Sequence, residues 1–144
     1  MTTSMTAHFP PHLTCRVYYE DTDAGGVVYY ANYLHFAERG RSEWIRAILK
    51  PEGPLWASDG PLFVMRHMEV DYLASAKLDN LLDIETTLTH IGSASLGMTQ
   101  IIKCEKIILT KMNVTLVCVG KDGKVLRIPP QWRQKLSTYL KEGA

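Results

Sequence analysis

The sequence is poor in the features that mark secreted, membrane and disulfide-rich proteins. Its three cysteines, Cys15, Cys104 and Cys118, are odd in number and widely spaced, which predicts neither a disulfide framework nor a cysteine metal site. No apolar run approaches the roughly 20 residues that span a bilayer. Residues 1–12 lack the basic start and apolar run of a signal peptide. We therefore expect a soluble, cytoplasmic protein without a membrane span.

The sequence also lacks an excess of charge of either sign. Lys and Arg total 16 and Asp and Glu total 15, which gives a formal net charge of +1. This balance produces no overall field that would attract nucleic acid or an anionic membrane, and we expect neither as a partner. The five histidines show no metal-ligand spacing, and no Ser or Cys lies in a nucleophile-elbow pattern. We expect no metal and no cofactor.

The order of apolar periods predicts one domain over 13–144, preceded by a flexible lead-in over 1–12. A strand is predicted from about Leu13 to Tyr19, and helical spacing of apolar residues predicts a long helix from Asn32 to Leu49. Short, turn-rich separators follow, so we expect consecutive strands to be antiparallel. The remaining predicted elements are strands over 61–73, 81–90, 95–108 and 110–120 and a helix over 131–141.

This order of elements predicts an α+β protein in which an antiparallel sheet wraps around the long first helix. One face of such a sheet would stay open, and open faces or edges are usually covered by a second copy, so we expect a homodimer or homotetramer. On the helix, Glu38 and Arg41 lie three residues apart on or beside the apolar stripe. They are predicted either to pair there or to lie on an exposed edge.

The stretch from Arg16 to Tyr33 carries the strongest candidates for chemistry. A strand is followed by Asp21 and Asp23, then by Gly25 and Gly26, and then by the aromatic start of the helix. A carboxylate can attack or deprotonate, and backbone N–H groups at a helix start stabilise an oxygen that gains negative charge. The two glycines permit positive φ or close approach of a substrate. The pattern suits hydrolysis of an acyl group.

Each of these residues also has a structural interpretation. Asp23 fits a helix cap or a turn as well as a catalytic group. Asp21 could raise the pKa of Asp23 by like-charge repulsion, but an acid at such a position more often makes local hydrogen bonds. Tyr29, Tyr30 and Tyr33 could line an acyl pocket or belong to the core, and the same choice applies to the neighbouring valines.

The loop residues closely resemble those of a known family. The run Tyr18–Tyr29, followed by Ala31–Leu34 and Glu38–Glu43, resembles the 4-hydroxybenzoyl-CoA thioesterase family of hotdog-fold proteins, nearest its Tol-Pal-associated acyl-CoA thioesterase branch. The resemblance extends over about residues 14–137. It implies a hotdog fold and hydrolysis of an acyl-CoA thioester to the free acid and CoA.

The resemblance also implies roles for individual residues. Asp23 would be the nucleophile or general base, and the backbone N–H of Tyr30 would polarise the thioester carbonyl. Four further residues are expected to contact the substrate: Gly26, Val27, Val28 and Tyr29. CoA would belong to the substrate, so the reaction needs no separate cofactor.

One difference from the family pattern leaves the acyl group open. The Tol-Pal-associated branch usually has His where this chain has Tyr30, whereas the aromatic acyl-CoA branch has Tyr there. A second class of function also stays open, that of a non-catalytic scaffold or sensor that binds acyl-CoA or an acyl carrier protein. The acid retained in the glycine loop favours the enzyme, because binding an anionic ligand needs no carboxylate. A dehydratase would need a His paired with an acid, and the loop has no His.

Overall fold

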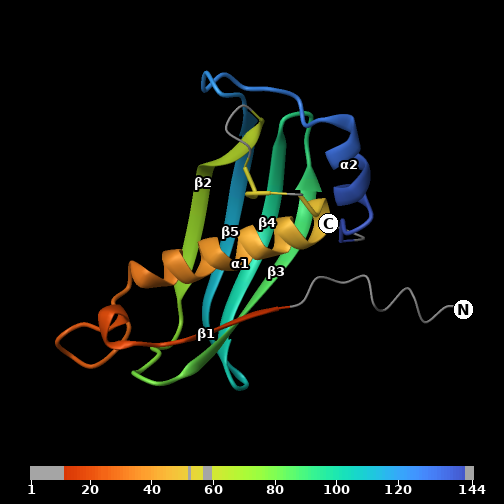
Figure 1. Ribbon diagram of the computed structural model, residues 1–144. Coiled ribbons are helices and arrows are strands. Elements are labelled where there is room, and N and C mark those ends of the chain that lie inside the picture. The colour runs from red at the N-terminus through yellow and green to blue at the C-terminus, as the bar shows by residue number, and fades with distance from the viewer. Residues whose placement is uncertain (1–11, 52, 57–59, 142–144) are drawn as a thin grey trace, which may run out of the picture.

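The computed structural model describes residues 12–51, 53–56 and 60–141 (Figure 1). Most of the expected lead-in therefore lies outside the described residues. A five-stranded sheet has the order β1-β3-β4-β5-β2, and every neighbouring pair is antiparallel. The strands are β1 (Leu13–Arg16), β2 (Leu62–Tyr72), β3 (Leu81–Ile91), β4 (Ser95–Cys104) and β5 (Ile107–Val119). The α+β prediction is confirmed.

The connections between strands explain the order of the sheet. Short turns join β3 to β4 and β4 to β5, so these three strands form the antiparallel meander that the sequence predicted. Strand β2 instead pairs with β5, which places β4 and β5 between it and β3. The segment 73–80 must therefore carry the chain from the β2 edge of the sheet, past β5 and β4, to the position of β3. Consecutive strands are antiparallel as expected, but β2 and β3 are not neighbours.

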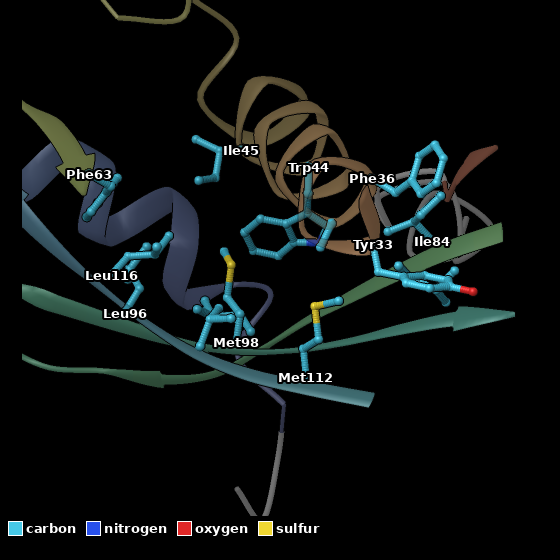
Figure 2. Close-up of a cluster of buried hydrophobic side chains, with 14 of the residues drawn as sticks. Tyr33, Phe36, Trp44, Ile45, Phe63, Ile84, Leu96, Met98, Met112 and Leu116 are labelled. Atoms are coloured by element: carbon cyan, nitrogen blue, oxygen red, sulfur yellow. The ribbon is translucent and has the colours of Figure 1, made fainter. Parts of the chain in front are cut away.

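Helix α1 (Asn32–Leu49) has the bounds that its apolar spacing predicted and crosses one face of the sheet (Figure 1). Its buried residues recur every three or four positions, as a helix that covers a sheet requires. Figure 2 shows Trp44 of this helix above Met98 and Met112 of the sheet. The C-cap of the helix is Lys50, whose backbone has the left-handed conformation with φ of 50° and which precedes a proline.

A buried glutamine ties α1 to the sheet. Gln100 of β4 is fully buried, and its Nε2 donates to the Ala37 carbonyl at 2.8 Å and to Thr86 Oγ1 at 3.0 Å. Its Oε1 accepts from the half-buried guanidinium of Arg41 at 3.1 Å, and burial lowers the pKa of that guanidinium. Among the ion pairs of the described residues there is none between Arg41 and Glu38. Glu38 is exposed and accepts from Ser42, so the alternative of a helix edge holds for Glu38.

Three predicted boundaries are wrong. The turn between β4 and β5 lies at Glu105-Lys106, where Glu105 has φ of 57°, and not near Leu109. Neither turn residue is Gly, Pro, Asn or Asp, so no residue typical of turns marks this position. The first strand ends at Arg16, since residues Tyr19–Asp21 form a short 3₁₀ helix. Helix α2 (Pro130–Ser137) is shorter than expected at its C-terminal end.

The chain beyond α2 covers part of a sheet edge. Because β1 pairs only with the first residues of β3, the remainder of that edge of β3 is left without a strand. Leu140 forms a parallel bridge with Leu88 there, and the Lys141 N–H donates to the Leu88 carbonyl at 2.9 Å. These bonds explain why the helical turns stop early. Within the described residues, neither helix has the length and apolar character needed to cross a membrane.

Gly40 offers a test of how closely α1 packs on the sheet. A Cβ at Gly40 would lie 2.4 Å from Cγ2 of Ile84, so Gly40→Ala should force the helix and β3 apart. Alanine favours a helix by about 1 kcal/mol, but overpacking costs about 1–3 kcal/mol. We expect urea unfolding to give a free energy of unfolding about 1–2 kcal/mol lower. In an Ile84→Ala background the same change should cost less, and an equal cost in both backgrounds would contradict this packing.

Candidate active site

The segment between β1 and α1, residues 17–31, folds back on itself and is called the site loop. Thr22 and Val28 form an antiparallel bridge, and the Asp23 N–H donates to the Val27 carbonyl at 2.9 Å. The Gly26 N–H in turn donates to the Asp23 carbonyl at 3.0 Å. Gly26 has φ of +82°, a conformation that residues with a side chain rarely adopt. The glycine therefore permits the sharp turn expected from the sequence.

Asp21 fixes the base of the site loop. The side chain of this residue is buried, and its Oδ2 accepts from the Tyr18 N–H at 2.8 Å. Its Oδ1 accepts from Nδ2 of Asn32 at 2.9 Å, and its carbonyl accepts from the Tyr29 N–H at 2.9 Å. One residue thus joins the end of the strand, the far side of the loop and the first turn of α1. The prediction that Asp21 makes local hydrogen bonds is confirmed.

Asp23 has a different environment two residues later. Its residue is exposed, and its Oδ1 accepts from the Gly25 N–H at 2.8 Å in a local turn. No donor among the described residues contacts its second oxygen, Oδ2. The two acids of the run therefore differ in their hydrogen bonding. Both oxygens of Asp21 accept hydrogen bonds within the fold, whereas one oxygen of Asp23 stays available.

The site loop forms one wall of a cavity of about 380 Å³. Asp23 and four of the other predicted site residues line it, whereas Gly26 shapes the turn behind it. The rest of the lining comes from α1, from the last residue of β2 and from the residues that follow it. The full lining is Asp23, Val27, Val28, Tyr29, Tyr30, Tyr33, Tyr72, Leu73, Ala74 and Ser75.

Aromatic rings form much of the cavity wall. The centroids of Tyr29 and Tyr30 lie 4.9 Å apart, and the ring of Tyr72 lies edge-on to Tyr30 and Tyr33 at 6.1 and 5.8 Å. Tyr33 is buried, its hydroxyl accepts from the Ala76 N–H at 2.9 Å, and burial raises its pKa. The segment after β2 also bonds to the site loop directly, since the Val28 N–H donates to the Ala76 carbonyl at 2.9 Å.

Sequence reasoning missed Tyr72 and the three residues after it. These residues lie some 40 positions beyond the site loop, where the sequence predicts a strand over 61–73 and no further feature before residue 78. No local pattern in the sequence links them to Asp23, because the link is made by the crossover between β2 and β3. The cavity is therefore completed by tertiary structure.

The backbone N–H of Tyr30 is open. Among the hydrogen bonds of the described residues, no backbone or side-chain acceptor takes it. Tyr30 immediately precedes Ala31, the N-cap of α1, so its N–H lies at the positive end of the helix dipole. The arrangement thus places an available carboxylate oxygen and an open amide donor on the same cavity.

A second group of ionisable residues lies away from this cavity. His12 Nδ1 is 3.4 Å from Asp83 Oδ2 and 3.9 Å from Glu85 Oε2, and the three ligand atoms lie within 4.8 Å of one another. The sequence did not predict this cluster, because His12 lies far from Asp83 and Glu85 in the chain. Lys103 already pairs with Glu85, and that hydrogen bond raises the pKa of Lys103. The carboxylates therefore have protein partners.

The fold and the site define the class of protein. The family model of the thioesterase superfamily matches residues 25–111, more than half of the 144-residue chain. The chain belongs to the thioesterase superfamily. The antiparallel sheet that wraps around α1 is the hotdog fold expected from the sequence, and the predicted family is confirmed.

Known relatives point in the same direction. The chain is 42% identical over 104 residues to the acyl-CoA thioesterase YbgC of Haemophilus influenzae, which covers 72% of this chain and 76% of the relative. It is 47% identical over 105 residues to the acyl-CoA thioester hydrolase YbgC of Escherichia coli O6:H1, with 72% and 78% covered. The branch expected from the sequence, that of acyl-CoA thioesterases, is confirmed.

Solved structures agree with this assignment. A protein described as a probable thioesterase from Bartonella henselae superposes with a TM-score of 0.77 at 38% identity, covering 82% of this chain and 98% of that one. A 1,4-dihydroxy-2-naphthoyl-CoA thioesterase from Synechocystis gives a TM-score of 0.71 over 88% and 94% of the two chains. At 20% identity, this second likeness shows the fold alone.

The buried carboxylate of Asp21 can be tested by an isosteric change. Asp21→Asn can keep the Tyr18 N–H bonded to its remaining oxygen if its NH₂ group faces Asn32, whose amide then turns so that its oxygen accepts. We expect the free energy of unfolding in urea to fall by about 1 kcal/mol, because hydrogen bonds to a carboxylate become weaker hydrogen bonds to a neutral amide. Glu20→Gln removes the same charge from the exposed neighbour and should change it by less than about 0.5 kcal/mol. Equal effects of the two changes would contradict the role given to Asp21.

Proposed function

We propose that this protein hydrolyses acyl-CoA thioesters to the free acid and CoA in the cavity of the site loop. Asp23 supplies the carboxylate, and the backbone N–H of Tyr30 polarises the thioester carbonyl. The observation that carries the proposal is that the available oxygen of Asp23 and the open N–H of Tyr30 belong to the lining of one cavity at the start of α1. The printed names of the YbgC relatives support acyl-CoA as the substrate.

The Tyr30 amide acts on the charge that develops during the reaction. Addition to the thioester carbonyl places negative charge on its oxygen, and an aligned N–H at a helix start stabilises that charge. A single donor of this kind typically contributes about 10²- to 10³-fold in rate. The donor is a backbone group, so it is independent of the side chain at position 30.

The Asp23 carboxylate can act by either of two routes. As a general base, it takes a proton from water while the water oxygen adds to the carbonyl carbon. As a nucleophile, it adds to that carbon itself and forms an anhydride that water then hydrolyses. In both routes the C–S bond breaks, and the departing CoA sulfur takes up a proton. The Gly25 N–H holds Oδ1, which leaves Oδ2 as the reacting atom.

The remaining lining residues would hold the acyl group. Val27, Val28 and Tyr29 offer apolar surface beside Asp23, and Gly26 keeps the loop in its turn. The chemistry uses water and residues of the chain, without a metal or cofactor. An acyl carrier protein is a further carrier from which the same site could take an acyl group. The three free cysteines agree with a reducing compartment, and we propose a cytoplasmic location.

A homodimer or homotetramer is part of the proposal. Strand β2 is a long edge of the sheet, and Val64 and Met65 on it are 41% and 39% exposed. Tyr30 beside the cavity is 62% exposed in the single chain. A second copy would cover an apolar edge that a lone chain leaves in water.

The activity and its catalytic residue can be tested together. Thiol release from short-chain, long-chain and aromatic acyl-CoAs, and from an acylated acyl carrier protein, should be followed for the parent and for Asp23→Asn. We expect the parent to hydrolyse at least one acyl-CoA and kcat to fall by at least about 10²-fold in the variant, because the amide cannot replace the carboxylate.

The matched control for this test is Asp122→Asn. Asp122 is exposed and accepts from the Lys124 N–H at 3.0 Å in a turn like that of Asp23, but it lies outside the cavity. Its variant should keep the parental rate. Full activity of Asp23→Asn would refute the catalytic assignment, and binding of acyl-CoA without turnover by the parent would favour the scaffold or sensor.

The proposed assembly can be measured by sedimentation. The chain has a mass of 16.3 kDa. We expect the parent at micromolar concentration to sediment as a dimer or tetramer, because association removes the exposed apolar residues of β2 from water. A stable monomer at that concentration would contradict the proposed association.

A further inference from the structure

The last residue of β2, Tyr72, contacts the residue to which the proposed function gives the carbonyl-polarising amide. Its hydroxyl donates to the backbone carbonyl of Tyr30 at 3.2 Å, and its ring lies edge-on to the Tyr30 ring. The two residues lie 42 positions apart in the chain. This contact therefore joins the end of β2 to the start of α1.

Tyr30 makes few other backbone hydrogen bonds. The first turn of α1 uses the carbonyls of its neighbours, since Asn32 N donates to Tyr29 at 2.8 Å and Leu34 N donates to Ala31 at 3.1 Å. Among the hydrogen bonds of the described residues, Tyr72 supplies the donor for the Tyr30 carbonyl. Because no acceptor in the described part of the chain takes the Tyr30 N–H, the hydroxyl of Tyr72 supplies the hydrogen bond that holds this backbone in place.

Tyr72 is itself held firmly. It pairs with Thr110 in the β2–β5 ladder, and the Leu73 N–H continues the ladder to the Leu109 carbonyl at 2.8 Å. Its ring also lies edge-on to the buried Tyr33 at 5.8 Å. A tyrosine hydroxyl has an ordinary pKa near 10 and so carries at neutral pH the proton that it donates, and burial raises the pKa of Tyr72 further. A fixed strand end can thus set the orientation of the more exposed Tyr30.

We propose that Tyr72 is a positioning residue for thioester hydrolysis, which holds the Tyr30 backbone so that its N–H points at the thioester carbonyl oxygen. The proposal rests on the function proposed above. Charge on that oxygen is largest in the transition state, so misalignment of the donor weakens transition-state binding more than substrate binding. The effect of losing the hydroxyl should therefore appear in kcat and not in KM.

The test compares Tyr72→Phe with the parent on the acyl-CoA that the parent hydrolyses fastest. This change removes one hydroxyl and keeps the ring that packs against Tyr30 and Tyr33. We expect kcat to fall about five-fold with KM within about two-fold of the parent; at 1.36 kcal/mol per tenfold, this corresponds to about 1 kcal/mol, the contribution of one hydrogen bond. The control is Tyr19→Phe, which removes a hydroxyl from a residue that is 83% exposed and outside the cavity.

A second measurement separates positioning from a general loss of folded protein. In ¹⁵N relaxation spectra, the order parameter of the Tyr30 amide should fall in Tyr72→Phe, while those of the β4 amides stay at the parental values. A smaller folded fraction would lower kcat without this local change. An unchanged Tyr30 order parameter would overturn the proposal even if kcat fell.

The kinetic outcomes distinguish this proposal from the one on which it rests. An active parent with an unchanged kcat in Tyr72→Phe would overturn the role of Tyr72 alone. A raised KM at unchanged kcat would identify Tyr72 as a residue that binds substrate, which also overturns positioning. A parent that hydrolyses none of the thioesters would overturn the proposed function, and the role of Tyr72 with it.

Discussion

The geometry of the site depends on one buried carboxylate. Asp21 accepts hydrogen bonds from Tyr18 and Asn32, so it fixes the end of the strand segment against the first turn of α1. Burial of an ionised group is costly unless its oxygens are bonded, and here both are. The residues between these anchors must therefore close into a tight loop. The position of Asp23 and the orientation of the helix start both follow from this constraint.

Asp21 and Asp23, which lie two positions apart, consequently have different environments. Asp21 points into the fold, whereas Asp23 borders a cavity and keeps one oxygen without a protein donor. The positive φ of Gly26 lets the chain reverse direction between Asp23 and Val27. A run of acids and glycines thereby holds one carboxylate within the fold and leaves the other beside the cavity, according to which side of the turn each carboxylate occupies.

The sequence was sufficient for the parts of the fold that local patterns encode. The bounds of α1 followed from its apolar spacing and from the proline after Lys50, and the family followed from the run around Asp23. The partner of Arg41 was not predicted, since its guanidinium donates to Gln100 of β4. The partner of a half-buried charge depends on which strand lies beneath the helix. Sequence spacing along the helix does not contain that information.

The half of the cavity that comes from Tyr72 and its neighbours could not be predicted for a related reason. The pairing of β2 with β5, and not with β3, brings the end of β2 to the site loop. Similarly, the turn at Glu105 carries a residue with positive φ but no residue typical of turns. In both cases strand pairing decides the structure, and a single sequence shows only the local preferences that pairing overrides.

The short segment after α2 has a consequence for how these molecules can associate. β1 covers the first residues of one edge of β3, and Leu140 and Lys141 bond to Leu88 farther along it. One border of the sheet is thus reduced to a four-residue strand, and β2 is the long border, with no strand of the described residues on its outer side. Growth by strand addition has a single starting place on each molecule. Two molecules joined there would have no comparable border left to recruit a third, so the sheet would end as a closed pair and not extend into a fibre.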